Sequence, residues 1–216
     1  MNANHENDEL ARQELAARLN LIETMIAEGR QTTERWGWTF VLWGIAYYVA
    51  IAWASLGHSN FAWPVTMVGT GILTGVIASR IGSREPETTM GRAIWATWIA
   101  VGISLFVFCI CSSIAGRIDQ QTFIAAVAAM VGTANAASGL VLKWKAQFAC
   151  AIVWWATAAA APFATVSQSS ILFLVAIFLC QIVFGGYMML SEARERKAAK
   201  SGTTKSRNTK SGAAHA

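Results

Sequence analysis

Two long stretches of this sequence carry no charged side chain. No Asp, Glu, Lys or Arg occurs between Arg35 and Arg80, a run of 44 residues (36–79), or between Lys145 and Glu192, a run of 46 (146–191). A helix rises about 1.5 Å per residue and the hydrocarbon core of a bilayer is about 30 Å thick, so each run is about twice the length of one crossing. Each run must therefore turn back and cross a membrane twice.

Polar residues mark where these runs are expected to turn, at 57–60 (Gly-His-Ser-Asn) and 167–170 (Ser-Gln-Ser-Ser). Two shorter apolar segments, on either side of Arg117 and Asp119, add two more crossings. A composition of 55% hydrophobic and 13% charged residues also favours a membrane protein. We therefore expect an all-α polytopic membrane protein with a bundle of six transmembrane helices. The predicted spans are residues 36–56, 61–81, 93–116, 120–142, 146–166 and 171–190.

The basic residues are divided unequally between the two ends of these spans. Of the 17 Lys and Arg residues, only Arg117 lies on one side, and the other 16 lie in segments 1–35, 80–92, 143–145 and 191–216. Because cytoplasmic segments are enriched in Lys and Arg, we expect both termini to lie in the cytoplasm. The basic residues flank spans instead of clustering with aromatic residues, which argues against a nucleic acid as partner despite the net charge of +5.

The N-terminal segment, residues 1–35, is predicted to form a short cytoplasmic amphipathic helix that Gly29 ends. It is acid-rich and long, so the first span is expected to be retained and not cleaved as part of a signal peptide. One face carries an apolar stripe at helical spacing, which is a candidate docking surface for a protein partner. Packing against the protein's own bundle is the interpretation that we expect, and docking of a partner or lying on the membrane surface are the alternatives. The stripe consists of Leu15, Leu19, Ile22 and Ile26.

The C-terminal segment, residues 191–216, is rich in Ser, Gly, Thr, Lys and Ala and has no apolar periodicity. Such a composition cannot bury a core, so we expect a disordered cytoplasmic tail. Its seven basic residues favour contact with anionic lipid headgroups.

A tetrapeptide of the second span returns in the fourth, since Met67–Thr70 and Met130–Thr133 both read Met-Val-Gly-Thr. The recurrence predicts three hairpin repeats, with a chance match in a biased composition as the alternative. The second span also contains Gly71 and Gly75, a spacing that allows close approach of another helix.

No Asp, Glu, Lys, Arg or His lies within the six predicted spans, apart from Arg80 at the end of the second. Driven transport, voltage sensing and intramembrane acid–base catalysis depend on such groups, and the chain carries no metalloprotease, phosphate-loop or nucleophile-elbow motif. We therefore expect no enzymatic activity, no cofactor and no metal site. The strongest polar groups are Asn135 and Gln181, predicted at similar depth, either hydrogen-bonded between helices or lining a path for a small solute. Further candidates for that polar lining are Thr70, Thr74, Thr133 and Ser138.

Nine of the ten tryptophans fall into two groups by depth. Indoles near the interfaces act as anchors, whereas the deeper ones either pack against small residues or form an aromatic wall for a lipid or hydrophobic ligand. The predicted anchors are Trp36, Trp38, Trp63, Trp95, Trp98 and Trp144. The candidate aromatic wall consists of Trp43, Trp154 and Trp155.

The junction at residues 25–48, MIAEGRQTTERWGWTFVLWGIAYY, resembles uncharacterised small bacterial multi-pass inner-membrane proteins. Those proteins have a short amphipathic helix ahead of a Gly/Trp-rich first span. The resemblance implies six spans and a plasma-membrane location, and it implies no activity.

Two hypotheses for function follow. The first is a non-enzymatic integral membrane protein, an accessory or regulatory subunit that acts through protein or lipid contacts, with a homo-oligomer as one form. The second is a small permease or facilitator for a neutral or hydrophobic solute. A polar cavity between the second, fourth and sixth spans, holding Asn135 and Gln181, favours the second hypothesis. A fully packed bundle with an exposed N-terminal stripe favours the first.

Overall fold

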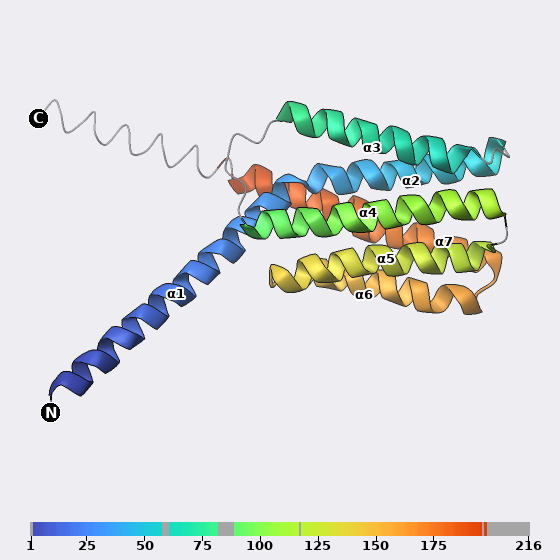
Figure 1. Ribbon diagram of the computed structural model, residues 1–216. Helices are drawn as coiled ribbons and strands as arrows, with labels where there is room; N and C mark the ends of the chain where they lie inside the picture. The colour runs from blue at the N-terminus through green and yellow to red at the C-terminus, as the bar shows by residue number, and fades with distance from the viewer. Residues whose placement is uncertain (1, 58–60, 82–88, 117, 196, 198–216) are drawn as a thin grey trace, which may run out of the picture.

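The computed structural model describes residues 2–57, 61–81, 89–116, 118–195 and 197. These residues are almost entirely helical, with no strand among them, and six helices are long and apolar enough to cross a membrane. The predictions of an all-α chain and of six apolar helices are therefore confirmed. The six helices lie side by side, the helix α1 (Asn2–Arg35) projects from the bundle, and the last described helix ends at the same end of the bundle (Figure 1).

The predicted spans are close to the observed helices in the first half of the chain and less so later. α4 begins at Thr89 and not at 93, and the last helical segment begins at Val166 and not at 171. The elements are α1 (Asn2–Arg35), α2 (Gly37–Gly57), α3 (Ala62–Ile81), α4 (Thr89–Ala115), α5 (Gln120–Val141), α6 (Lys145–Ala160), the 3-10 turn η1 (Ala161–Phe163), α7 (Val166–Ile177) and the π-helical turn η2 (Phe178–Val183). After η2 the α-helix continues to Glu195.

The turn between the last two spans precedes the Ser-Gln-Ser-Ser segment at 167–170. α6 ends at Ala160, and Pro162 lies in the 3-10 turn, where its ring and missing N–H disfavour a continued α-helix. Thr165 and Gln168 then form a capping box, in which the Gln168 N–H donates to Thr165 Oγ1 and the Thr165 N–H donates to Gln168 Oε1. This box begins α7 at Val166, so the predicted turn at 167–170 is wrong.

α1 is longer than the short helix that the sequence predicts, with 34 residues, and Gly29 does not end it. Gly29 lies where α1 meets the bundle: a Cβ added there would be 3.0 Å from Leu142 and 3.1 Å from Met90. Only this end of α1 is packed. Leu15, Leu19 and Ile22 of the stripe are 59%, 54% and 50% exposed, which contradicts the interpretation that the stripe packs against the protein's own bundle.

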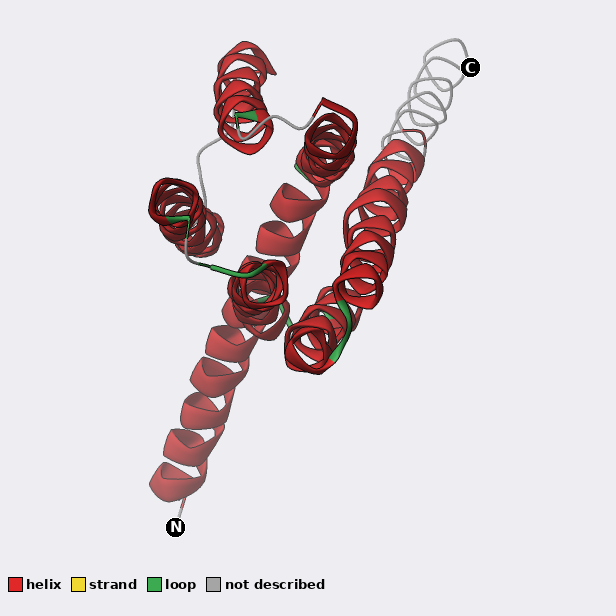
Figure 2. Ribbon diagram, turned by 90° about the vertical axis from the view of Figure 1, so that its right-hand side faces the viewer, coloured by secondary structure: helices red, strands yellow, loops and turns green. Residues whose placement is uncertain are grey.

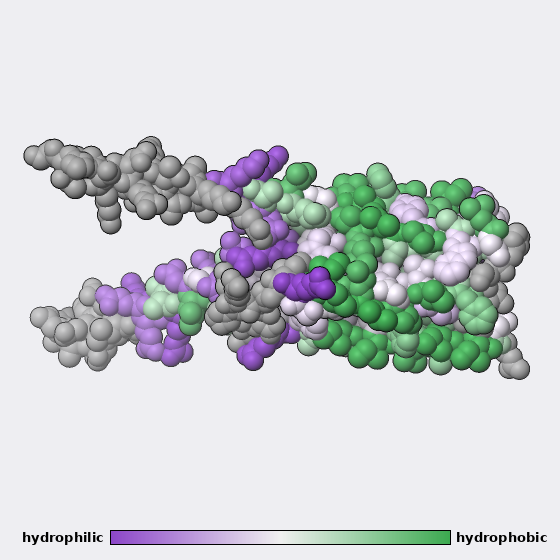
Figure 3. All heavy atoms as spheres, turned by 90° about the horizontal axis from the view of Figure 1, so that it is seen from above, coloured by the Kyte–Doolittle hydropathy of each residue, from purple (hydrophilic) through white to green (hydrophobic). Residues whose placement is uncertain are grey.

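The bundle is packed unequally. α5 and α6 form the most extensive helix pair, and α7 and η2 complete a core around Trp154 and Ile177. Figure 2 shows the spans end-on, from the side opposite α1. Most residues of α3 and α4 are not covered by other parts of this chain, and the bundle presents a broad apolar surface, with hydrophilic residues gathered at the α1 end (Figure 3).

Candidate functional site

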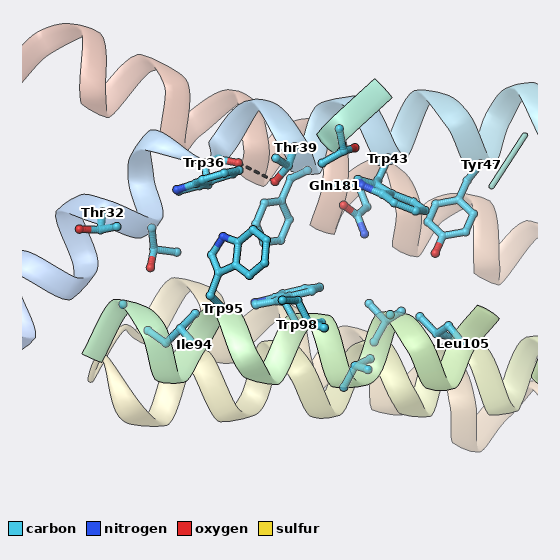
Figure 4. Close-up of a pocket in the computed structure, with 18 residues that line it drawn as sticks. Thr32, Trp36, Thr39, Trp43, Tyr47, Ile94, Trp95, Trp98, Leu105 and Gln181 are labelled. Carbon is cyan, nitrogen blue, oxygen red and sulfur yellow. Dashed lines mark hydrogen bonds between the residues drawn. The ribbon is translucent and has the colours of Figure 1, made fainter. Parts of the chain in front are cut away.

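A cavity of about 310 Å³ lies between α2 and α4, within the range of small-molecule sites. It begins at Thr32 and Thr33, near the end of α1, and its last lining residues on α2 and α4 are Tyr47 and Leu105 (Figure 4). The residues that line it are mostly apolar and none is charged. The arrangement is therefore suited to binding an apolar molecule within the bundle of apolar helices.

Two rows of side chains at helical spacing form the walls of this cavity. Residues three or four apart lie on one face of a helix, so each row is continuous along its helix. The rows meet where the rings of Trp36 and Trp95 lie 6.0 Å apart and those of Phe40 and Trp98 lie 5.3 Å apart, both edge to face. The rows are Trp36, Phe40, Trp43 and Tyr47 on the α2 side, and Trp95, Trp98, Gly102 and Leu105 on α4.

Gln181 supplies a polar group deep in this cavity, with its amide in the space between the two rows (Figure 4). It is only 4% exposed, and its side chain makes no hydrogen bond with any described residue. Gln181 belongs to the π-helical turn η2, a geometry that is rare and often found at functional sites. Gly44 allows η2 to approach α2, because a Cβ at Gly44 would lie 2.8 Å from Gln181 Cβ.

Asn135, the predicted partner of Gln181, is not hydrogen-bonded to it. Asn135 is buried on α5, where its Nδ2 donates to the Val131 carbonyl of its own helix at 3.0 Å. Its Oδ1 has no partner among the described residues. Val131 lines the cavity, whereas Asn135 does not.

The candidates for a polar lining are divided between different surroundings. Thr74 lines the cavity and donates to the Thr70 carbonyl at 2.8 Å. Ser138 is buried and accepts a hydrogen bond of 3.0 Å from Trp98 Nε1, which fixes one of the cavity indoles. Thr70 is buried outside the lining and Thr133 is exposed. Of the predicted polar residues, the structure brings Thr74 and Gln181 to one site.

The candidate aromatic wall of Trp43, Trp154 and Trp155 is not continuous. Trp43 lines the cavity. Trp154 is 1% exposed in the core, and Trp155 is exposed beside Gly132. Among the cavity indoles, the sequence analysis assigned Trp36, Trp95 and Trp98 to the interface. Their spacing within each helix was the available signal, but nothing in the sequence showed that α2 and α4 face each other.

Gln147 is a buried polar residue that the sequence analysis passed over. It lies in the first turn of α6, is fully buried, and both Oε1 and Nε2 are without a partner among the described residues. Gln147 does not line the cavity.

Polar contacts hold the C-terminal end of α1 (residues 29–35), called here the root of α1, against the bundle. The Arg30 guanidinium lies 4.9 Å from the centre of the Trp144 ring, and Arg30 Nε donates to Glu34 Oε1 at 3.3 Å. Gln31 Nε2 donates to Glu195 Oε2 at 3.4 Å. Burial raises the pKa of Glu34; the Arg30 guanidinium opposes this rise and the Glu195 carboxylate adds to it.

No protein-family model, curated protein or solved structure matches this chain. Function is therefore inferred from the two features that the geometry provides. One is the exposed stripe on the projecting helix α1, and the other is the apolar cavity with its single buried amide.

Proposed function

We propose that this chain is a non-enzymatic multi-pass protein of the inner (plasma) membrane, an accessory or regulatory subunit that acts through a protein partner at its cytoplasmic face. The observation that carries this proposal is α1. It projects from the bundle (Figure 1), and Leu15, Leu19 and Ile22 are exposed along it. An apolar stripe on a helix is the surface that a groove in another protein receives.

The charge of the N-terminal segment supports a protein partner over a membrane surface. Residues 1–35 contain seven acidic and four basic side chains, a net charge of −3. Anionic lipid headgroups attract basic segments and repel acidic ones. The partner expected here has an apolar groove with basic residues at its rim.

The cytoplasmic placement rests on the distribution of Lys and Arg, with 16 on one side of the spans and Arg117 on the other. An even number of spans agrees with α1 and the end of the last described helix lying at one end of the bundle (Figure 1). Part of the basic tail, 198–216, lies outside the described residues, and so does the predicted disorder there. Contact of this tail with anionic lipid headgroups belongs to the same proposal.

A facilitator for a neutral or hydrophobic solute is the second candidate, and the α2–α4 cavity is the observation that favours it. The cavity ends at Tyr47 and Leu105, near the middle of α2 and in the second half of α4. A hollow that covers part of the membrane thickness supports binding more directly than passage. The accessory role is therefore placed first.

Photo-crosslinking tests the proposal. A benzoylphenylalanine at Ile22 is expected to give protein adducts in native membranes, and the same residue at Ala17, on the opposite face of α1, is expected to give none. Introducing Leu15→Asp with Leu19→Asp should abolish the Ile22 adducts, because charges in an apolar contact are costly to desolvate. Adducts of twice the chain's mass would mean that the partner is a second copy of this chain. Equal adducts from Ile22 and Ala17 would overturn the proposal.

A further inference from the structure

The α2–α4 cavity has walls that suit a flat apolar molecule. Indole rings line both sides, with Phe40 and Tyr47 added on the α2 side, and only a few polar side chains reach it. The hydroxyls of Thr33, Thr39 and Thr74 already donate to carbonyls of their own helical segments. A ring system can stack against such walls, and aromatic contacts of this kind add to the simple burial of apolar area.

Gln181 makes a purely hydrocarbon occupant unsatisfactory. An amide buried in a membrane protein without a hydrogen-bond partner is unfavourable, and an acyl chain offers neither donor nor acceptor. The Gln181 amide supplies a donor and an acceptor. An occupant that carries one oxygen beside its apolar body satisfies the amide and fills the cavity together.

The surroundings of Gln181 hold this geometry in place. The π-helical turn η2 sets the amide between the two rows of side chains, and Gly44 admits η2 close to α2. On the opposite wall, the hydrogen bond from Trp98 Nε1 to Ser138 fixes the indole. A preformed apolar pocket with a small number of fixed polar groups is the usual construction of a small-molecule site.

We propose that the cavity between α2 and α4 binds a lipophilic ring compound that carries a carbonyl or hydroxyl oxygen, with Gln181 as its hydrogen-bond partner. The indoles stack against the ring. This site is independent of the docking surface on α1, so the failure of either proposal leaves the other standing.

Two glycines provide a matched pair of blocking variants. Gly102 lines the cavity on α4, and a Cβ added there meets no atom within 4 Å. Gly69 on α3 also has no atom within 4 Å of an added Cβ, but it does not line the cavity. The first carbon of a new side chain therefore fits without a clash at either position, and only at Gly102 does that side chain start from the cavity lining.

The test is equilibrium dialysis of the full-length protein in lipid nanodiscs, with the binding to empty nanodiscs subtracted. The probes are menadione, which has ring carbonyls, 1-naphthol, which has a hydroxyl, and 2-methylnaphthalene, which has no oxygen. One neutral hydrogen bond corresponds to about 3- to 10-fold in affinity, so at least one oxygen-bearing probe should bind more tightly than the hydrocarbon by that factor. The preferred probe distinguishes a quinone-like ligand from a ring alcohol.

Variants assign this preference to the cavity. Gln181→Leu should remove the advantage of the oxygen-bearing probe, whereas Gln147→Leu, the same change outside the cavity, should keep it. Gly102→Phe should weaken binding of all probes at least tenfold, and Gly69→Phe should leave binding unchanged. This pair shows whether the probes bind in the cavity even if Gln181→Leu fails to fold. Equal affinity of the wild-type protein for all three probes, or unchanged binding by Gly102→Phe, would overturn the proposal.

Discussion

Two regions of the bundle use glycine in opposite ways. In α5, 56% of the membrane-length window is buried within the bundle, and a Cβ at Gly139 would lie 2.7 Å from the Phe148 backbone nitrogen. In α3 and α4 the buried shares are 11% and 6%, and added Cβ atoms at Gly75 and Gly102 meet nothing within 4 Å. Small residues thus allow close packing in one region and leave open surface in the other. The cavity lies between α2 and the open helix α4.

The repeated Met-Val-Gly-Thr tetrapeptide shows this contrast within identical sequence. A Cβ at Gly132 would lie 2.6 Å from Trp155 Cδ1, whereas one at Gly69 has open space. The threonines that follow these glycines show the opposite contrast: Thr70, after the open Gly69, is buried, and Thr133, after the packed Gly132, is exposed. A short sequence match therefore does not give these two spans the same surroundings, because the neighbouring helices decide which face is covered.

The largest expected effect comes from comparing a buried and an exposed tryptophan. Trp154→Ala removes a core side chain that is 1% exposed and should lower the free energy of unfolding by about 3–5 kcal/mol. Trp95→Ala on α4 removes a side chain that is 47% exposed, so a loss of about 1 kcal/mol, chiefly its ring contact with Trp36, is expected. Unfolding in sodium dodecyl sulfate, followed by circular dichroism, measures both. Equal losses would mean that the two regions are equally packed.

Gln147→Leu sharpens the description of the packed region. Its amide is fully buried without a partner among the described residues, so an apolar side chain of similar size should raise the free energy of unfolding by about 1 kcal/mol. The same unfolding measurement applies. A clear loss of stability would show that the amide is hydrogen-bonded, for example to a buried water.

The smallest expected effect concerns pH and the root of α1. Because burial raises the pKa of Glu34 above its ordinary value of 4.5, the folded state binds this proton more tightly than the unfolded state does. The resulting stabilisation is complete below pH 4.5 and is lost as pH rises through the higher folded-state pKa. Glu34→Gln lacks this proton equilibrium, so its stability relative to the wild-type protein should increase with pH above 4.5. A difference that stays constant from pH 4 to pH 8 would contradict this assignment.

Charge-free runs predicted the six apolar helices, because excluding charge from hydrocarbon constrains sequence directly. Local chemistry also determines the last turn, because the capping box of Thr165 with Gln168 begins α7. The predicted turn was placed instead at the polar residues 167–170, which include only Gln168 of this box. The cavity could not be predicted, since it depends on α2 and α4 facing each other. No sequence pattern marks the π-helical turn that positions Gln181, so the residue was identified but its surroundings were not.

The most direct measurement is the same substitution in the two copies of the tetrapeptide, Gly132→Ala and Gly69→Ala, followed by unfolding in sodium dodecyl sulfate. At Gly132 the new methyl group meets the indoles of α6, and overpacking should lower the free energy of unfolding by about 1–3 kcal/mol. At Gly69 the methyl group meets nothing, and the better helix propensity of Ala should raise it by about 0.5–1 kcal/mol. Changes of opposite sign are predicted. Changes of the same sign and size would contradict the division of the bundle into a packed and an open region.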